Sequence, residues 1–159
     1  MGLWSRLDAR FGFRTDRGRI AAGTWREGAG LLAGVLAVLT LLWLFIEPYT
    51  HRELGPGTAL FDARTFLAFV YLLFYAFAVI FIGISFYNLG ARRWRDRGRP
   101  SGFAGLPLVL ALVAGSVHWL QPRVADVMSI WYVVGADIAF ASVLVWTIVE
   151  LGFLPPREP

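Results

Sequence analysis

The sequence predicts an all-α polytopic membrane protein with four transmembrane helices. Of its 159 residues, 57% are hydrophobic, and the mean hydropathy of +0.60 is too apolar for a soluble domain of this length. The charged residues are bunched between long uncharged runs, as expected when a low-dielectric bilayer excludes ions. Four such runs are present, and each is long enough to cross the hydrocarbon core of a bilayer.

The first two spans are expected at residues 28–47 and 65–90. Residues 28–46 are uncharged between Glu27 and Glu47, and at about 1.5 Å per residue they reach roughly 28 Å. The second span lies in an uncharged run between Arg64 and Arg92, which is long enough to cross the bilayer with a tilt.

The last two spans are expected at residues 101–121 and 128–150. The third contains His118 as its one ionisable group, and Pro107 predicts a kink in it. The fourth contains Asp137 before it reaches Glu150. The domain organisation follows: a basic N-terminal tail at 1–27, a four-helix transmembrane domain at 28–152 and a C-terminal tail at 153–159.

The arginines predict that both chain ends lie in the cytoplasm. Six arginines precede the first span and five lie between spans two and three, against two and one in the other connections. Positively charged flanks stay inside, which gives an N-in/C-in orientation. All fifteen basic residues are arginine, which favours a GC-rich bacterial source and the bacterial inner membrane. A mitochondrial presequence, also arginine-rich, is the less favoured alternative because Asp8, Asp16 and Glu27 interrupt the tail.

The N-terminal tail has the pattern of a short helix lying in the membrane interface. One arc of a helical wheel carries the apolar side chains of Leu3, Trp4, Leu7 and Phe11. The alternative is a mobile tail, which Gly12 and Gly18 favour.

Asp137 is the first candidate for chemistry, because a carboxylate inside the membrane is costly and usually faces a partner or a cavity. Counted along a helix from Asp126, Asp137 lies roughly 16 Å deep, similar to the depth of Tyr75 counted from Arg64. His118 is shallower, and the estimated depths allow a hydrogen-bonded cluster of Tyr75, Asp137 and His118 in the outer half of the membrane. Its functional interpretation is a proton or cation relay, and its structural interpretation, which we favour, is a protonated Asp137 within helix packing.

The second candidate is the basic loop from Ala91 to Pro100, with the residues that follow it. Its functional interpretation is an anionic headgroup site, in which Ser101 caps the third span beside arginines. The favoured alternative is a topology determinant that rests on anionic lipid at about 1 kcal/mol per arginine. The candidate residues are Arg92, Arg93, Arg95, Arg97, Arg99 and Ser101.

The sequence offers no support for catalysis, cofactors or metals. It lacks cysteine, and its two histidines, His51 and His118, lie on different segments. The common hydrolase, protease and nucleotide-binding motifs are also missing. Because the arginines flank apolar spans, anionic lipid is expected as the partner and nucleic acid is not.

Pairs of small residues four apart predict close helix packing, either inside the bundle or in a homo-oligomer. They are Gly30 with Gly34, Ala111 with Gly115, and Gly135 with Ala139.

The segment RRWRDRGRPSGF at residues 92–103 resembles the signature of a bacterial inner-membrane family, the one catalogued as domain of unknown function 805. That signature has paired arginines, His-Asp and then Gly-Lys/Arg-Ser-Gly-aromatic. Residues 18–20 (GRI) and 149–153 (VELGF) resemble two further family segments. The departures are Arg95 in place of the histidine, Pro100 inserted before Ser101, Ala22 in place of a second arginine, and a tail that lacks the Gly-Pro-Asn-rich pattern. The resemblance implies a small inner-membrane protein and supplies no mechanism.

These observations predict a non-enzymatic interaction, assembly or envelope-associated component of the membrane, in contact with anionic lipid. The alternative is a small transporter or channel subunit that uses Asp137, as a homo-oligomer or with another membrane protein.

Overall fold

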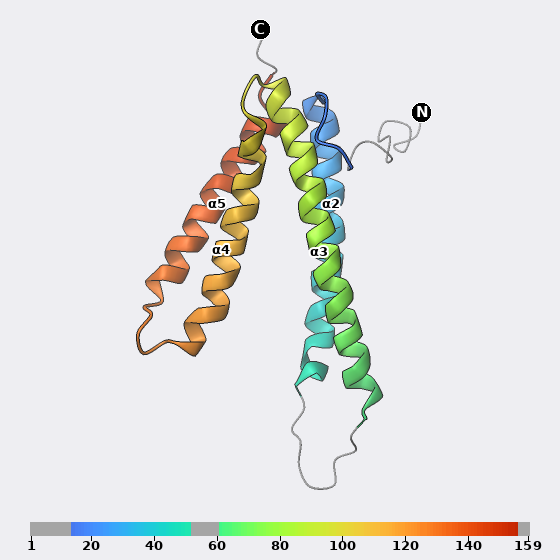
Figure 1. The fold of residues 1–159 in the computed structure, drawn as a ribbon, viewed down its shortest axis with the longest axis vertical. Helices are drawn as coiled ribbons and strands as arrows, with labels where there is room; N and C mark the ends of the chain where they lie inside the picture. Colours follow the sequence, from blue (N-terminus) through green and yellow to red (C-terminus); the bar gives the residue numbers. More distant parts are fainter. Residues whose placement is uncertain (1–13, 52–60, 156–159) are drawn as a thin grey trace. The chain divides into compact units, whose positions relative to one another are not determined.

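The computed structural model describes residues 14–51 and 61–155, and all the regular structure in them is helical. The long helices are α2 (Ala22–Ile46), α3 (Ala63–Asp96), α4 (Leu106–Leu120) and α5 (Trp131–Gly152) (Figure 1). Short 3₁₀ helices follow or precede them at Glu47–Thr50, Ser101–Gly105 and Gln121–Arg123. The predicted interfacial helix at Leu3–Phe11 lies outside the described residues.

Four helical segments are long and apolar enough to cross a membrane. They are Ala22–Thr50, Ala63–Asp96, Ser101–Arg123 and Trp131–Gly152. This confirms the predicted fold class at the level of an all-helical, multi-pass membrane protein.

The largest difference from the predicted boundaries is at the end of α3. The helix continues to Asp96, so most of the expected Ala91–Pro100 loop is helical, because arginine is a good helix former. Gly98, at φ +65°, then ends the helix. The Arg99 N–H donates to the Trp94 carbonyl at 2.9 Å and the Gly98 N–H to the Arg95 carbonyl at 3.0 Å, which is a Schellman motif.

Two other helix boundaries also differ from the predicted ones. The first helix begins at Ala22, six residues before the expected span, and so includes Arg26 and Glu27. The third span opens with a 3₁₀ turn, and Pro107 lies in the first turn of α4. A proline is tolerated there because it has no N–H to leave unpaired, and the kink predicted within the span stays a prediction.

The chain divides into two compact units, which we describe separately. Unit two, Gly30–Ile84, is a hairpin of α2 and α3. The Tyr71 hydroxyl donates to the Leu39 carbonyl at 2.6 Å, and the Tyr75 and Thr40 hydroxyls are 2.9 Å apart. Two hydrogen bonds and aromatic contacts therefore join these two apolar helices.

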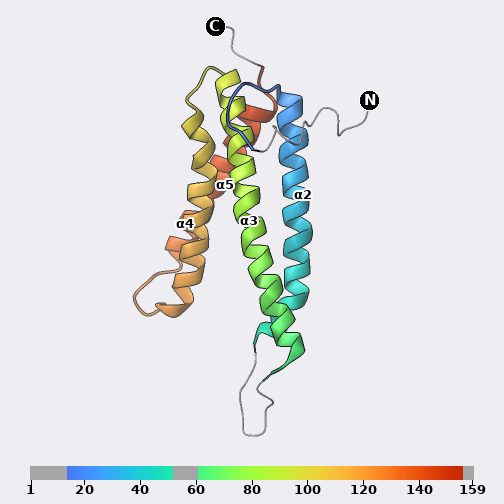
Figure 2. The same cartoon turned by 45° about the vertical axis from the view of Figure 1, so that its right-hand side comes forward.

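Unit one comprises the start of α2, the end of α3, and the helices α4 and α5. Helices α4 and α5 lie side by side in both ribbon views (Figure 2). Its core is built on Trp94, which is fully buried. The Trp94 ring centroid lies 5.0 Å from that of Trp146 and 5.5 Å from that of Phe103. This aromatic group joins the end of α3 to the first turn of the third span and to α5.

The glycines with the least space for a side chain are not the ones in the predicted pairs. A Cβ on Gly90 would lie 3.0 Å from the Cβ of Ala104, and one on Gly28 would lie 2.8 Å from a Leu89 methyl group. Around the glycines of the predicted pairs, a Cβ would meet nothing within 4 Å; these are Gly30, Gly34, Gly115 and Gly135. Within each unit, the described residues do not pack closely against those four glycines, and close helix packing at them stays a prediction.

Candidate functional site

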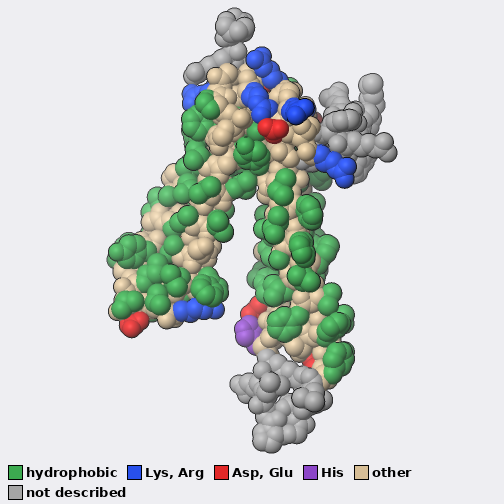
Figure 3. Space-filling view, viewed as in Figure 1, with side chains coloured by type: hydrophobic (Ala, Val, Ile, Leu, Met, Phe, Trp, Pro, Cys, Tyr) green, Lys and Arg blue, Asp and Glu red, His purple; other side chains and the backbone are tan. Residues whose placement is uncertain are grey.

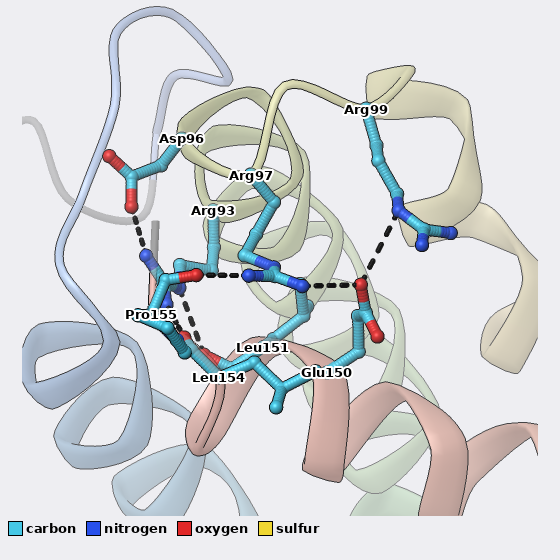
Figure 4. A network of polar contacts seen from close by, with 8 residues as sticks. All are labelled: Arg93, Asp96, Arg97, Arg99, Glu150, Leu151, Leu154 and Pro155. Atoms are coloured by element: carbon cyan, nitrogen blue, oxygen red, sulfur yellow. Dashed lines mark hydrogen bonds and ion pairs between the residues drawn. The ribbon is translucent and has the colours of Figure 1, made fainter. Parts of the chain in front are cut away.

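The arginine-rich end of α3 meets the end of α5 in unit one (Figure 4). Arg93 is completely buried. Its Nε donates to the Leu151 carbonyl at 2.9 Å, one terminal nitrogen donates to the Leu154 carbonyl at 2.6 Å, and the other donates to the Asp96 carboxylate. The last carbonyls of a helix lack partners within that helix. Arg93 therefore caps α5 from a neighbouring helix and places positive charge at the negative end of its dipole.

Arg97, the residue after α3, forms a second buried connection to the end of α5. It donates to Glu150 Oε1 at 2.8 Å and to the Pro155 carbonyl. The Arg97 and Glu150 side chains are 5% and 9% exposed. Arg99 Nε lies 3.4 Å from the same Glu150 oxygen, and its guanidinium lies over the Trp94 ring at 5.9 Å. One glutamate thus pairs with two arginines, one buried and one partly exposed, and the three side chains keep a net positive charge.

Arg95 connects the N-terminal segment to α3. It donates to the Asp16 carboxylate at 2.7 Å and to the Asp16 carbonyl. This hydrogen bond, more than any other cause, holds the pKa of Asp16 below its ordinary value. Both side chains are partly exposed, so the pair positions the segment without closing it off from water.

Ser101 does not cap the third span as expected. The N-cap position of the 3₁₀ helix belongs to Pro100, and no side chain caps that helix. Pro100 occupies the N-cap position, so Ser101 lies inside the first turn, where its hydroxyl is not at the capping position. Arg92 is half-buried in α3.

Most of the predicted anion-site arginines thus have partners inside the protein, and the headgroup hypothesis for them stays a prediction. The sequence reasoning missed Glu150 and Asp16 as those partners. Both acids lie on the predicted cytoplasmic side, together with the basic segment. Opposite charges at one membrane face were the signal that could have identified them.

Two of the three predicted intramembrane residues lie together. The His118 Nε2 is 3.0 Å from both carboxylate oxygens of Asp137, on α4 and α5 of unit one. Their side chains are 57% and 49% exposed. Tyr75 belongs to unit two, where its hydroxyl bonds that of Thr40.

The estimated depth of Asp137 requires correction. The 16 Å estimate treats residues 126–137 as one helix, but α5 begins only at Trp131. Asp137 is therefore about 9 Å from the start of α5, whose 22 residues span about 33 Å. Asp137 lies well short of the helix midpoint. At its position, the free-energy cost of burying a charge in the membrane is lower than at the centre.

Within residues 14–51 and 61–155, no group of three His, Cys, Asp or Glu side chains could hold a metal ion. Comparison with known proteins found no matching family model, no matching curated protein and no matching solved structure.

Proposed function

We propose that this chain is a non-enzymatic component of the bacterial inner membrane, with both ends in the cytoplasm, acting in interaction, assembly or envelope organisation. Its arginine-rich end rests on anionic lipid. The resemblance to the bacterial family catalogued as domain of unknown function 805 belongs to this proposal and favours the same location.

The observation that carries the proposal is that the arginines fall into two groups, one bonded inside the protein and one exposed. Those at the end of α3 bind acceptors inside the protein, whereas four near the start of α2 are exposed. The exposed group consists of Arg14, Arg17, Arg19 and Arg26. Figure 3 shows basic side chains gathered at the end of unit one where α3 ends. Exposed arginines beside membrane spans attract anionic headgroups at about 1 kcal/mol each.

Lipid retention after release from nanodiscs tests this proposal. Native mass spectrometry should find phosphatidylglycerol on the wild type, and less of it when the four exposed arginines are replaced by Gln. A double replacement of Arg64 and Arg123, which flank other span ends, is the control and should retain the wild-type amount. Equal retention by the wild type and the fourfold variant would overturn the lipid contact.

The second candidate function is a small transporter or channel subunit, and one observation favours it. The His118–Asp137 pair is an acid and a base in hydrogen-bond contact on two spanning helices. Reconstituted protein would then conduct protons or cations, and Asp137→Asn would abolish the flux while leaving the helices intact. Wild-type vesicles without flux, or full flux in the variant, would exclude this function.

A further inference from the structure

An open cavity of about 440 Å³ lies in unit one beside the arginine cluster. This volume is within the roughly 300–1,000 Å³ range of small-ligand sites. Its walls come from the segment that enters α2, from the end of α3 and from the chain that follows α5. Figure 4 shows four residues that border it: Arg93, Asp96, Leu154 and Pro155.

The charges that face this cavity are unbalanced. Three arginines and one aspartate line it: Arg19, Arg26, Arg93 and Asp96. Arg93 and Asp96 pair with each other. Arg19 and Arg26 are exposed, and neither has a hydrogen bond or ion pair with any residue that the structure describes. Two guanidinium groups are thus available to an anion that enters the cavity.

The position of Arg26 is set by its apolar contacts. A Cβ on Gly152 would lie 3.5 Å from the Arg26 Cγ, so the side chain runs along the end of α5. Its guanidinium lies 5.6 Å from the Phe153 ring centroid. This contact orients the Arg26 guanidinium and leaves its N–H groups free to donate to an anion. Because the side chain is already oriented, less conformational entropy is lost when an anion binds.

The backbone adds donors at the same wall. Ala21 and Ala22 line the cavity, α2 begins at Ala22, and its first turn contains no acidic residue. The first N–H groups of a helix have no partners within it, and they attract anions.

The remaining walls are apolar, and they lie where two membrane spans end. Ile20, Phe153 and Leu154 border the cavity near the start of α2 and the end of α5. Headgroup phosphates lie at this depth. We propose that the cavity binds a phosphate group through Arg19 and Arg26, with an anionic phospholipid as the source that its apolar walls favour. The lipid source rests on the lipid contact of the proposed function, whereas phosphate binding does not.

Titration of the detergent-solubilised full chain tests the site. Native mass spectrometry should show that Arg19→Gln with Arg26→Gln weakens phosphatidylglycerol binding on the order of tenfold or more, with phosphatidylcholine as the neutral reference. Arg14→Gln with Arg17→Gln removes the same charge outside the cavity and should weaken binding by a clearly smaller factor than the cavity pair. Ala21→Glu, which leaves both arginines in place, should repel the lipid as the double variant does.

The outcomes separate the two proposals. Equal weakening in both arginine pairs would overturn the cavity site and leave a general lipid contact. Displacement of phosphatidylglycerol by millimolar inorganic phosphate would identify the same site with a soluble source as a competitor. Binding unchanged in all variants would overturn both the site and the contact. Thermal unfolding of each variant without added lipid should match the wild type, since Arg19, Arg26 and Ala21 are exposed.

Discussion

Arg93 satisfies three different acceptors from one buried side chain, and each acceptor is bound by a different nitrogen of the guanidinium. Its planar fork carries five N–H donors in fixed directions, whereas a lysine offers one compact ammonium. The acceptors are the Leu151 carbonyl at the end of α5, the Leu154 carbonyl just after it, and the Asp96 carboxylate on α3. Arginine at this position therefore has a structural role that its charge alone does not explain.

Glu150→Gln should destabilise the protein strongly. It would remove the carboxylate that pairs with buried Arg97 and lies near Arg99, and breaking a buried pair costs about 3–5 kcal/mol. Tryptophan fluorescence during unfolding in detergent would measure the loss, since Trp94 lies beside Arg99. Glu47→Gln is the control: Glu47 is 44% exposed and pairs only with exposed His51 among described residues, so it should change stability by less than about 1 kcal/mol. Equal effects of the two substitutions would contradict the buried-pair interpretation.

The Asp16 carboxyl group should titrate below its ordinary pKa of 3.8, because Arg95 donates a hydrogen bond to its ionised form. A depressed pKa in the folded protein means that the contact stabilises the fold above pH 3.8 and is lost as the pH falls through the lower value. Carbon-13 NMR of the Asp16 carboxyl would report the midpoint. In Arg95→Gln the midpoint should rise toward the ordinary value, and a midpoint unaffected by this substitution would refute the cause.

At the scale of elements, α3 contributes residues to both units of the chain, as α2 does. Its first part pairs with α2 in unit two, and its last part packs in unit one. The apolar run explains the first part. The last part remains helical because arginines are compatible with a helix and because Gly98 supplies a left-handed residue only at its end.

Gly90→Ala should destabilise unit one, by about 1–3 kcal/mol. The new methyl group would lie 3.0 Å from the Ala104 Cβ and 3.6 Å from its Cα, so backbone has to move. Gly115→Ala is the matched control in α4, where a Cβ meets nothing within 4 Å and the better helix propensity of alanine should leave stability equal or higher. Thermal unfolding in detergent compares the two, and a Gly90→Ala protein as stable as Gly115→Ala would exclude this tight contact.

At the scale of the whole molecule, four helices long and apolar enough to cross a membrane and an uneven distribution of arginine predict a direction for the chain in the membrane. The arginines of the predicted cytoplasmic face have two uses: those on α3 bind acidic side chains and carbonyls, and others near α2 are exposed. The same charges can therefore orient the protein during insertion and hold its helix ends together afterwards.

Reporter fusions should reveal an N-in/C-in topology. Green fluorescent protein fused after Pro159 should fluoresce, whereas alkaline phosphatase should be active when fused after Asp126 and inactive when fused after Arg99. Activity after Arg99 with none after Asp126 would mean that the orientation is inverted.

The sequence by itself determined the membrane class, the number of spans and their approximate positions. These properties depend on local hydropathy and on the thickness of the bilayer, which act on each segment separately. It also identified His118 and Asp137, which form a hydrogen bond in the structure, as candidate partners, because each is the lone ionisable side chain in the interior of its span and polar groups in the membrane seek partners.

Only the tertiary structure decided what the arginines do. Arg93 and Arg97 find backbone carbonyls and an acid that lie 53 to 61 residues further along the chain, and a backbone acceptor leaves no trace in a residue pattern. The same holds for Gly90, whose importance depends on the neighbour it meets, and for Tyr75, which pairs with Thr40 in unit two. The sequence predicts which segments are rich in charge. The positions of the helix ends decide which acceptor each arginine binds, because hydrogen bonds require contact within about 3 Å.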